Sequence, residues 1–249
     1  MSRILACIDN SAAARPVLAA ARVLAPVLNA TVQAVHVREN GDRTARAAAS
    51  ALGVPLQTLD GDPVEQLASS AAADDVVAVV IGARGRPCGR HAGHLALGLA
   101  NRVATPVVVV PPDAELPAEL HRVLVAIEGT PRNSRRLKRA IELSQGAGLE
   151  LVLVHVDDES SIPSFSDQVA HETESYAHEF LARFAPGAQA ARLELRVGAP
   201  ADEILTAADS ERPDLVAMGW PQSDDPARGV VAREVLDRIH RPVLLVASV

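Results

Sequence analysis

The sequence repeats itself, and this repeat constrains the fold more than any other feature. Residues 3–11 read RILACIDNS, and residues 122–130 read RVLVAIEGT. Further matching blocks follow in the same order: Val35-His36-Val37 with Val154-His155-Val156, Gly61-Asp62-Pro63 with Gly198-Ala199-Pro200, Ile81-Gly82 with Met218-Gly219, and residues 105–110 with 241–246. Matching blocks in a conserved order indicate a tandem duplication.

The duplication divides the chain into two domains of ordinary size. A proline-containing segment, PPDAELP at residues 111–117, separates the copies. We therefore predict a first domain at 1–112, a linker at 113–120 and a second domain at 121–249, a length that suffices for two small cores. The second copy carries extra residues around 157–185.

Within each copy, short apolar runs alternate with longer stretches of helical period. In the first copy the predicted strands are 3–8, 31–37, 54–59, 76–81 and 106–110, and the predicted helices are 12–28, 42–52, 63–74 and 94–103. The strands are continuously apolar, which is typical of a parallel sheet covered by helices on both faces. Each copy is therefore predicted to be an α/β domain with a doubly wound, five-stranded parallel sheet.

Composition excludes several classes of protein. The chain is 48% apolar with a net charge of −7, which favours a folded globular protein. Residues 1–120 contain no aromatic side chain, and both halves have more acidic than basic residues, so no nucleic-acid partner is expected. Two cysteines cannot form a disulfide framework. We identify no signal peptide and no apolar run long enough to span a membrane. We therefore expect a cytoplasmic protein with no membrane partner.

Candidate ligand-binding residues follow two strands of the first copy. In doubly wound sheets, ligands bind at the carboxyl ends of the strands. Asp9 and Ser11 follow the first strand, and the Gly- and Arg-rich segment 82–93, which includes Arg84, follows the fourth and leads into a helix. Glycines, arginines and a helix N-terminus suit an anion. The alternatives are a solvated connection for 82–93 and a helix N-cap role for Asp9 or Ser11.

Other chemistry is not indicated. Cys88, His91 and His94 have a spacing found in metal sites, but no fourth ligand is evident, so no metal is predicted. His36 and His155 occupy matching strand ends and are predicted to be structural. The sequence contains no nucleophile motif or paired carboxylates in an evident cleft, and we predict no catalytic residues and no enzyme activity.

These motifs together resemble the universal stress protein family. The resemblance rests on the Asp after the first strand, the His-Val that ends the second, the complete Gly-x-Pro-x-x-x-Ile block at residues 198–204, the glycine loop and the Pro-Val final strand. Each of the two copies shows the resemblance, so that together they cover nearly the whole chain. The resemblance implies the doubly wound fold predicted above, and some members of the family carry two copies in one chain.

Some members of the family bind ATP through a loop of the form G-x2-G-x9-G-[ST]. By position, this resemblance assigns a nucleotide site to Asp9, Val37, Gly82, Gly85 and Gly93. Ser11, Arg84 and His94 complete the candidate set. The loop here reads G-x2-G-x7-G-H, two residues shorter and without the hydroxyl. ATP is thus a possible ligand of the first domain, and no cofactor is required.

The second copy departs further from that pattern. Glu128 replaces the Asp, Trp220 follows the first glycine of the loop, and Gly229 precedes a valine instead of a hydroxyl residue. This copy resembles family members that do not hold ATP. If one site survives, we expect it in the first copy.

Two functions follow as hypotheses. The first is a non-catalytic stress-response regulator that binds an adenine nucleotide in its N-terminal domain. The second is a nucleotide-free interaction scaffold for an unknown protein partner. In that scaffold the last strands, 107–110 and 243–246, would pair to form an intramolecular pseudo-dimer, because apolar edge strands need covering. A further homodimer stays open.

Overall fold

The computed structural model describes residues 1–38, 41–83, 93–157, 173–185, 187–188, 191–223, 225 and 227–247. Strands and helices alternate through both halves, as predicted. The first half comprises β1 (Arg3–Cys7), α1 (Ala14–Val27), β2 (Thr31–Val37), α2 (Arg43–Ala51), β3 (Leu56–Leu59), α3 (Pro63–Ala71), β4 (Val76–Gly82), α4 (His94–Arg102) and β5 (Val107–Val110). Each element lies within a few residues of its predicted position.

The second half repeats this order of elements. It comprises β6 (Arg122–Ala126), α5 (Pro131–Gly146), β7 (Glu150–Asp157), α6 (Thr173–Phe184), β8 (Arg192–Val197), α7 (Pro200–Glu211), β9 (Leu215–Trp220), α8 (Val230–Arg238) and β10 (Val243–Ala247). The extra residues of this half fall between β7 and α6 and within α6. The insertion predicted around 157–185 thus precedes the third strand of the second half.

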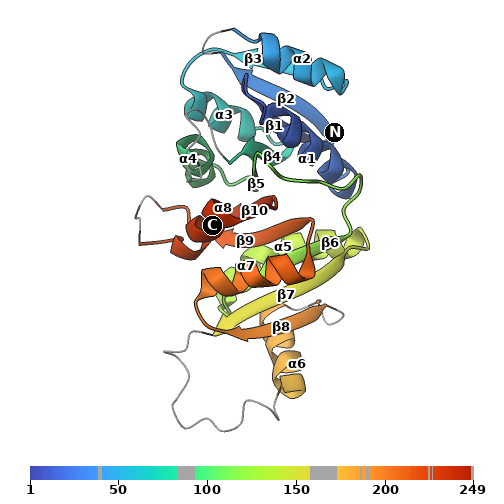
Figure 1. The fold of residues 1–249 in the computed structure, drawn as a ribbon, viewed down its shortest axis with the longest axis vertical. Coiled ribbons are helices and arrows are strands. Elements are labelled where there is room, and N and C mark those ends of the chain that lie inside the picture. Colours follow the sequence, from blue (N-terminus) through green and yellow to red (C-terminus); the bar gives the residue numbers. More distant parts are fainter. Residues whose placement is uncertain are drawn as a thin grey trace.

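All ten strands form one continuous sheet (Figure 1). Their order is β3-β2-β1-β4-β5-β10-β9-β6-β7-β8, so the strand order of one half is mirrored in the other. Neighbouring strands are parallel except at the centre, where β5 and β10 run antiparallel with Val109 opposite Val243 and Val107 opposite Leu245. The predicted pairing of the two last strands is confirmed.

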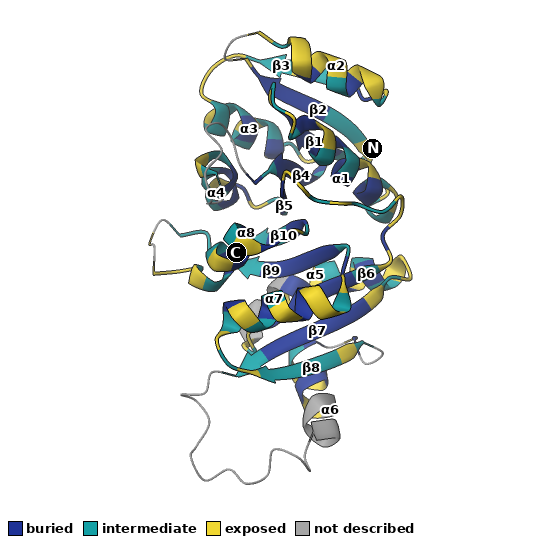
Figure 2. Ribbon diagram, viewed as in Figure 1, coloured by how far each residue is buried: buried dark blue, intermediate teal, exposed yellow. Residues whose placement is uncertain are grey.

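The core lies in two layers, one on each face of the sheet, and both layers run through both halves. Val107 and Val109 of β5 belong to one layer, whereas Val108 and Val110 belong to the other. Figure 2 shows buried residues along the inner strands and a mixture of buried and exposed residues along the helices. The four consecutive valines of β5 are fully explained by this position, since both faces of the strand are covered.

The two outer strands limit further sheet growth in different ways. β3 is only four residues long. β8 carries Arg192, Glu194 and Arg196, which form ion pairs with one another and with Glu203 and Glu211 of α7. Short or charged edge strands discourage pairing with another sheet.

Candidate functional site

The strand register brings three predicted site residues of the first half to one edge of the sheet. Cys7 at the end of β1 lies opposite Ile81 of β4 and Val35 of β2. The residues just beyond these positions are Asp9, Gly82 and Val37, so all three lie at the carboxyl ends of the adjacent strands β1, β4 and β2. A β-carbon on Gly82 would lie 3.6 Å from the Ala13 β-carbon, which shows that the chain after Asp9 returns to the end of β4.

Asp9 forms a turn ahead of helix α1. Its Oδ1 accepts hydrogen bonds from the Ser11 backbone N–H (2.9 Å) and hydroxyl (2.5 Å), and the Ser11 Oγ accepts one from the Ala13 N–H (3.1 Å). The N-cap of α1 is Ala13, and no side chain caps it. The alternative in which Asp9 or Ser11 is the N-cap does not hold, because their turn precedes the cap residue Ala13 and the helix starts at Ala14. The exposed carboxylate remains accessible to a ligand.

Asn10 holds the chain next to Asp9 in place. Its side-chain amide donates to the Gly41 carbonyl oxygen (3.0 Å), and its Oδ1 accepts from the Ala45 N–H (3.0 Å). The side chain thereby connects the end of β1 to the first turn of α2. The sequence reasoning missed this residue, although a polar residue directly after a buried strand is the usual signal for such a contact.

The two repeated histidines are structural, as predicted. His36 is buried, and its two ring nitrogens lie 3.0 Å from the carbonyl oxygens of Ile8 and Gly41. His155 repeats the first contact, with Nδ1 at 2.8 Å from the carbonyl oxygen of Ile127. Each ring therefore joins the second strand of its half to the end of the first.

The start of α4 completes the described part of this edge. Gly93 is the N-cap in an extended conformation and has no side chain to cap the helix, and His94 is the first helical residue and is exposed. The Gly93 N–H donates to the Ala83 carbonyl oxygen, so the two residues that flank segment 84–92 are joined. Uncapped N–H groups at a helix start favour an anion. The predicted site residues Arg84 and Gly85 lie outside the described residues.

In the second half, aromatic side chains occupy the corresponding place. Trp220, at the end of β9, is fully buried, and the Arg233 guanidinium lies 5.1 Å from its ring. A β-carbon on Gly229, the residue that matches Gly93, would lie only 3.3 Å from the Trp220 ring. Likewise, a β-carbon on Gly129 would lie 3.3 Å from the ring of Phe180. In this half, aromatic rings therefore pack against two glycines near the carboxyl ends of the strands.

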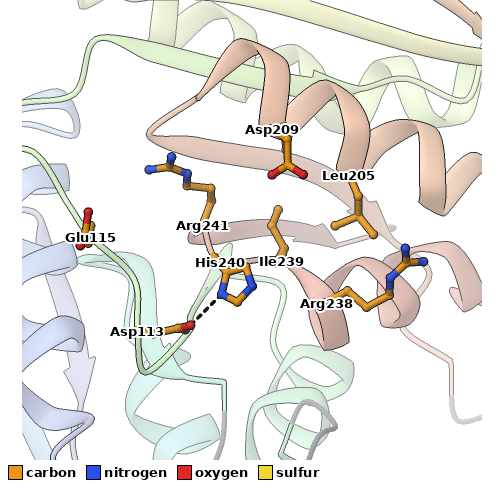
Figure 3. Close-up of a pocket in the computed structure, with 9 residues that line it drawn as sticks. Asp113, Glu115, Leu205, Asp209, Arg238, Ile239, His240 and Arg241 are labelled. Atoms are coloured by element: carbon orange, nitrogen blue, oxygen red, sulfur yellow. Dashed lines mark hydrogen bonds and ion pairs between the residues drawn. The ribbon is translucent and has the colours of Figure 1, made fainter.

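A cavity of about 420 Å³ lies elsewhere, where the connection between the halves passes the second half (Figure 3). Its walls come from the linker, α7 and the turn between α8 and β10, and its charged residues are Asp113, Glu115, Asp209, Arg238, His240 and Arg241. His240 Nδ1 lies 2.6 Å from Asp113 Oδ2, which ties the linker to the turn before β10. None of the predicted site residues lines this cavity, and the sequence reasoning did not anticipate it.

Two other kinds of site are absent from the described part of the chain. Its His, Cys, Asp and Glu residues form no group of three or more that could hold a metal ion. Of the possible metal ligands considered above, Cys88 and His91 are not among the described residues. No described helix combines the length and the apolar character needed to cross a bilayer.

The comparisons with known proteins agree with the fold. A functionally unknown protein from Pseudomonas aeruginosa PAO1 matches 100% of this chain over 93% of its own, with 15% identity and a TM-score of 0.74. A universal stress protein from Archaeoglobus fulgidus DSM 4304 matches 99% of this chain over 96% of its own, with 17% identity and a TM-score of 0.68. No curated protein matches the sequence. At these identities the two structures establish a shared α/β fold.

The sequence itself matches a family model. The model describes the universal stress protein family and matches residues 119–247, from the end of the linker to the last described strand. It therefore covers the second half. The chain belongs to the universal stress protein family.

Proposed function

We propose that the chain is a tandem pair of universal stress protein domains whose N-terminal domain binds an adenine nucleotide. The first domain would span residues 1–112 and the second 121–249, joined by 113–120. The support for two domains of one kind is the repeated series of sequence blocks and the mirrored strand order of the two halves. The protein would act as a non-catalytic stress-response regulator, through binding instead of turnover.

One observation carries the nucleotide proposal: Asp9, Val37, Gly82 and the uncapped start of α4 meet at one edge of the first half. This edge offers a carboxylate acceptor for hydroxyl or amino groups, an apolar side chain for a base, and helix N–H groups for a phosphate. Ser11, Arg84, Gly85 and His94 belong to the same proposed site by their positions in the sequence. The strands that meet at this edge, β1, β2 and β4, end on Cys7, Val37 and Gly82.

The second domain supports the assignment by contrast. Trp220 and Phe180 occupy the place where a ligand would lie, so this domain would be stable without one. Glu128, which takes the position of Asp9, is exposed. We therefore expect one nucleotide for each chain.

The test is isothermal titration calorimetry of the purified protein with ATP and with AMP. We expect wild type to bind one equivalent, Asp9→Ala to bind more weakly, and the matched change Glu128→Ala in the second half to leave binding unchanged. Ser11 belongs to the proposed site and also donates a hydrogen bond to Asp9, so Ser11→Ala should weaken binding as well.

The scaffold hypothesis makes the opposite prediction. A wild-type protein that shows no heat of binding at millimolar ATP or AMP would refute the nucleotide proposal. Equal weakening by Asp9→Ala and Glu128→Ala would refute the assignment of the site to the first half. Extraction and mass analysis of small molecules that copurify with the protein gives an independent check.

A further inference from the structure

The second half contacts the carboxyl-terminal end of α4, the helix whose first residues belong to the proposed nucleotide site. The Gln222 side-chain amide donates to the carbonyl oxygens of Val103 (2.6 Å) and Ala100 (3.4 Å). The last carbonyl groups of a helix have no partner within the helix and need one from elsewhere. Gln222, from the other half of the chain, supplies it.

A second contact between the halves comes from Trp220, two residues before Gln222 in the chain. The indole N–H of Trp220 donates to Oδ1 of Asn101 on α4, at 2.8 Å. Trp220 is fully buried, so its orientation is fixed by packing against Arg233 and Gly229. An N–H group buried at this depth requires an acceptor, and Asn101 is that acceptor. The contact therefore fixes the position of α4 relative to β9.

The backbone at Gln222 is unusual. Its φ of +46° is in the left-handed region, which non-glycine residues rarely adopt because the β-carbon approaches the following carbonyl. Such a conformation persists only where surrounding contacts maintain it, and it is found where a side chain must be held in a particular place. Here it holds the amide against the end of α4.

The repeat explains where this contact comes from. Gly219 and Trp220 match Gly82 and Ala83, so Gln222 lies where the first half has Gly85 in its glycine-rich segment. In the second half, the segment that matches the proposed nucleotide loop contacts the other half instead of a ligand. Figure 1 shows α4 next to this side of the second half.

We propose that Trp220 and Gln222 are positioning residues for the nucleotide site: they hold α4 from its far end, so that its first residues meet the ligand in a fixed orientation. The inference rests on the proposed function of the first half. Helix α4 has nine residues, so its ends are only about 13 Å apart at the usual rise. A short, rigid helix transmits a displacement at one end to the other.

The experiment compares wild type with Gln222→Met, which keeps the size of the side chain and removes its donors. Gln145→Met is the matched control, since the Gln145 amide also donates to a backbone carbonyl, that of Gly187, but does so far from α4. Two readouts are needed: hydrogen exchange of peptides that cover residues 93–103, followed by mass spectrometry without nucleotide, and calorimetric titration with AMP. Trp220 is the only tryptophan, so its fluorescence during the same titration reports on the contact directly.

We expect Gln222→Met to accelerate exchange in 93–103 and to weaken AMP binding by about two- to tenfold, the range for the loss of one hydrogen bond. Gln145→Met should change neither, and AMP should alter the emission of Trp220 in wild type. Unchanged exchange or unchanged affinity in Gln222→Met, with AMP bound by wild type, overturns the positioning role and leaves the proposed function intact. No AMP or ATP binding by wild type refutes the proposed function and, with it, the coupling, even if Gln222→Met accelerates exchange.

Discussion

The change Gly229→Ala adds one methyl group next to the Trp220 ring. It therefore tests how tightly that ring packs at the end of the second half of the sheet. Gly229 lies at the start of α8 with φ of +69°. A β-carbon there would lie 3.1 Å from Cγ of Pro221 and 3.3 Å from the ring of Trp220. Gly229→Ala therefore combines an unfavourable backbone conformation with a collision against two rigid rings.

The cost of the backbone conformation and the cost of the crowding can be measured separately, by substituting two other glycines of the same half. Gly148 has φ of +71° and no atom within 4 Å of a built β-carbon, so Gly148→Ala carries the conformational cost alone, about 1–2 kcal/mol. Gly146, at the end of α5, has neither a positive φ nor a neighbour, and Gly146→Ala should be neutral or stabilise by up to about 1 kcal/mol. Gly229→Ala adds crowding worth about 1–3 kcal/mol. Its total destabilisation should therefore be about 2–5 kcal/mol.

The assay is urea unfolding of wild type and the three variants, followed by circular dichroism and by tryptophan fluorescence. In thermal melts, each kcal/mol corresponds to a shift of about 2–4 °C for a chain of this length. We expect the order of stability Gly146→Ala, Gly148→Ala, Gly229→Ala, from highest to lowest. If Gly229→Ala is no less stable than Gly148→Ala, the Trp220 ring can move aside, and the conclusion that it fills the site is refuted.

Three further predictions follow from the described contacts. Burial raises the pKa of the Cys7 thiol to about 12, so in a Cys88→Ser variant it should resist alkylation at pH 8 and react fully once urea unfolds the chain; rapid labelling of the native protein would contradict this. The hydrogen bond from Arg192 holds the pKa of the Glu211 carboxyl below its usual value, so the ionised form stabilises the fold above about pH 4 and the contribution is lost as the pH falls through the lowered pKa. Glu211→Gln should thus be less stable than wild type at pH 7, and the difference should shrink as the pH falls through the lowered pKa; an equal loss at every pH would show that the charge is unimportant. A β-carbon on Gly82 meets its nearest neighbour at 3.6 Å, so Gly82→Ala should change stability by less than about 1 kcal/mol while weakening nucleotide binding, if the missing side chain serves the ligand.

Local sequence patterns predicted most of this fold because each strand is buried on both faces. The continuous apolar runs at β2 and β4 differ from the surrounding helical periods, and both strands were placed within one residue. The repeat then predicted the second half from the first. The pairing of β5 with β10 could also be anticipated, since a run of four valines at a sheet edge requires a cover.

The site was less predictable, because its contacts depend on side-chain geometry over a short distance. Asp9 and Ser11 have the composition of helix caps, yet they bond to each other and the helix starts at Ala14. Nor does the sequence indicate that Gln222 reaches α4: a glutamine in a polar loop carries no signal of its partner. The sequence did not predict the charged cavity either, because the residues that line it come from three segments that are far apart in the sequence.

The aromatic residues connect these observations. The first half has none of the five Phe, Tyr and Trp residues, and its buried hydrophobic side chains are Val, Leu, Ile, Ala and Cys. The second half has all five, and the rings of Trp220 and Phe180 lie close to Gly229 and Gly129. The Trp220 indole also donates a hydrogen bond to Asn101 of α4 in the other half. One side chain therefore links the two proposals, since it packs at the end of its own half of the sheet and contacts the helix that begins at the proposed nucleotide site.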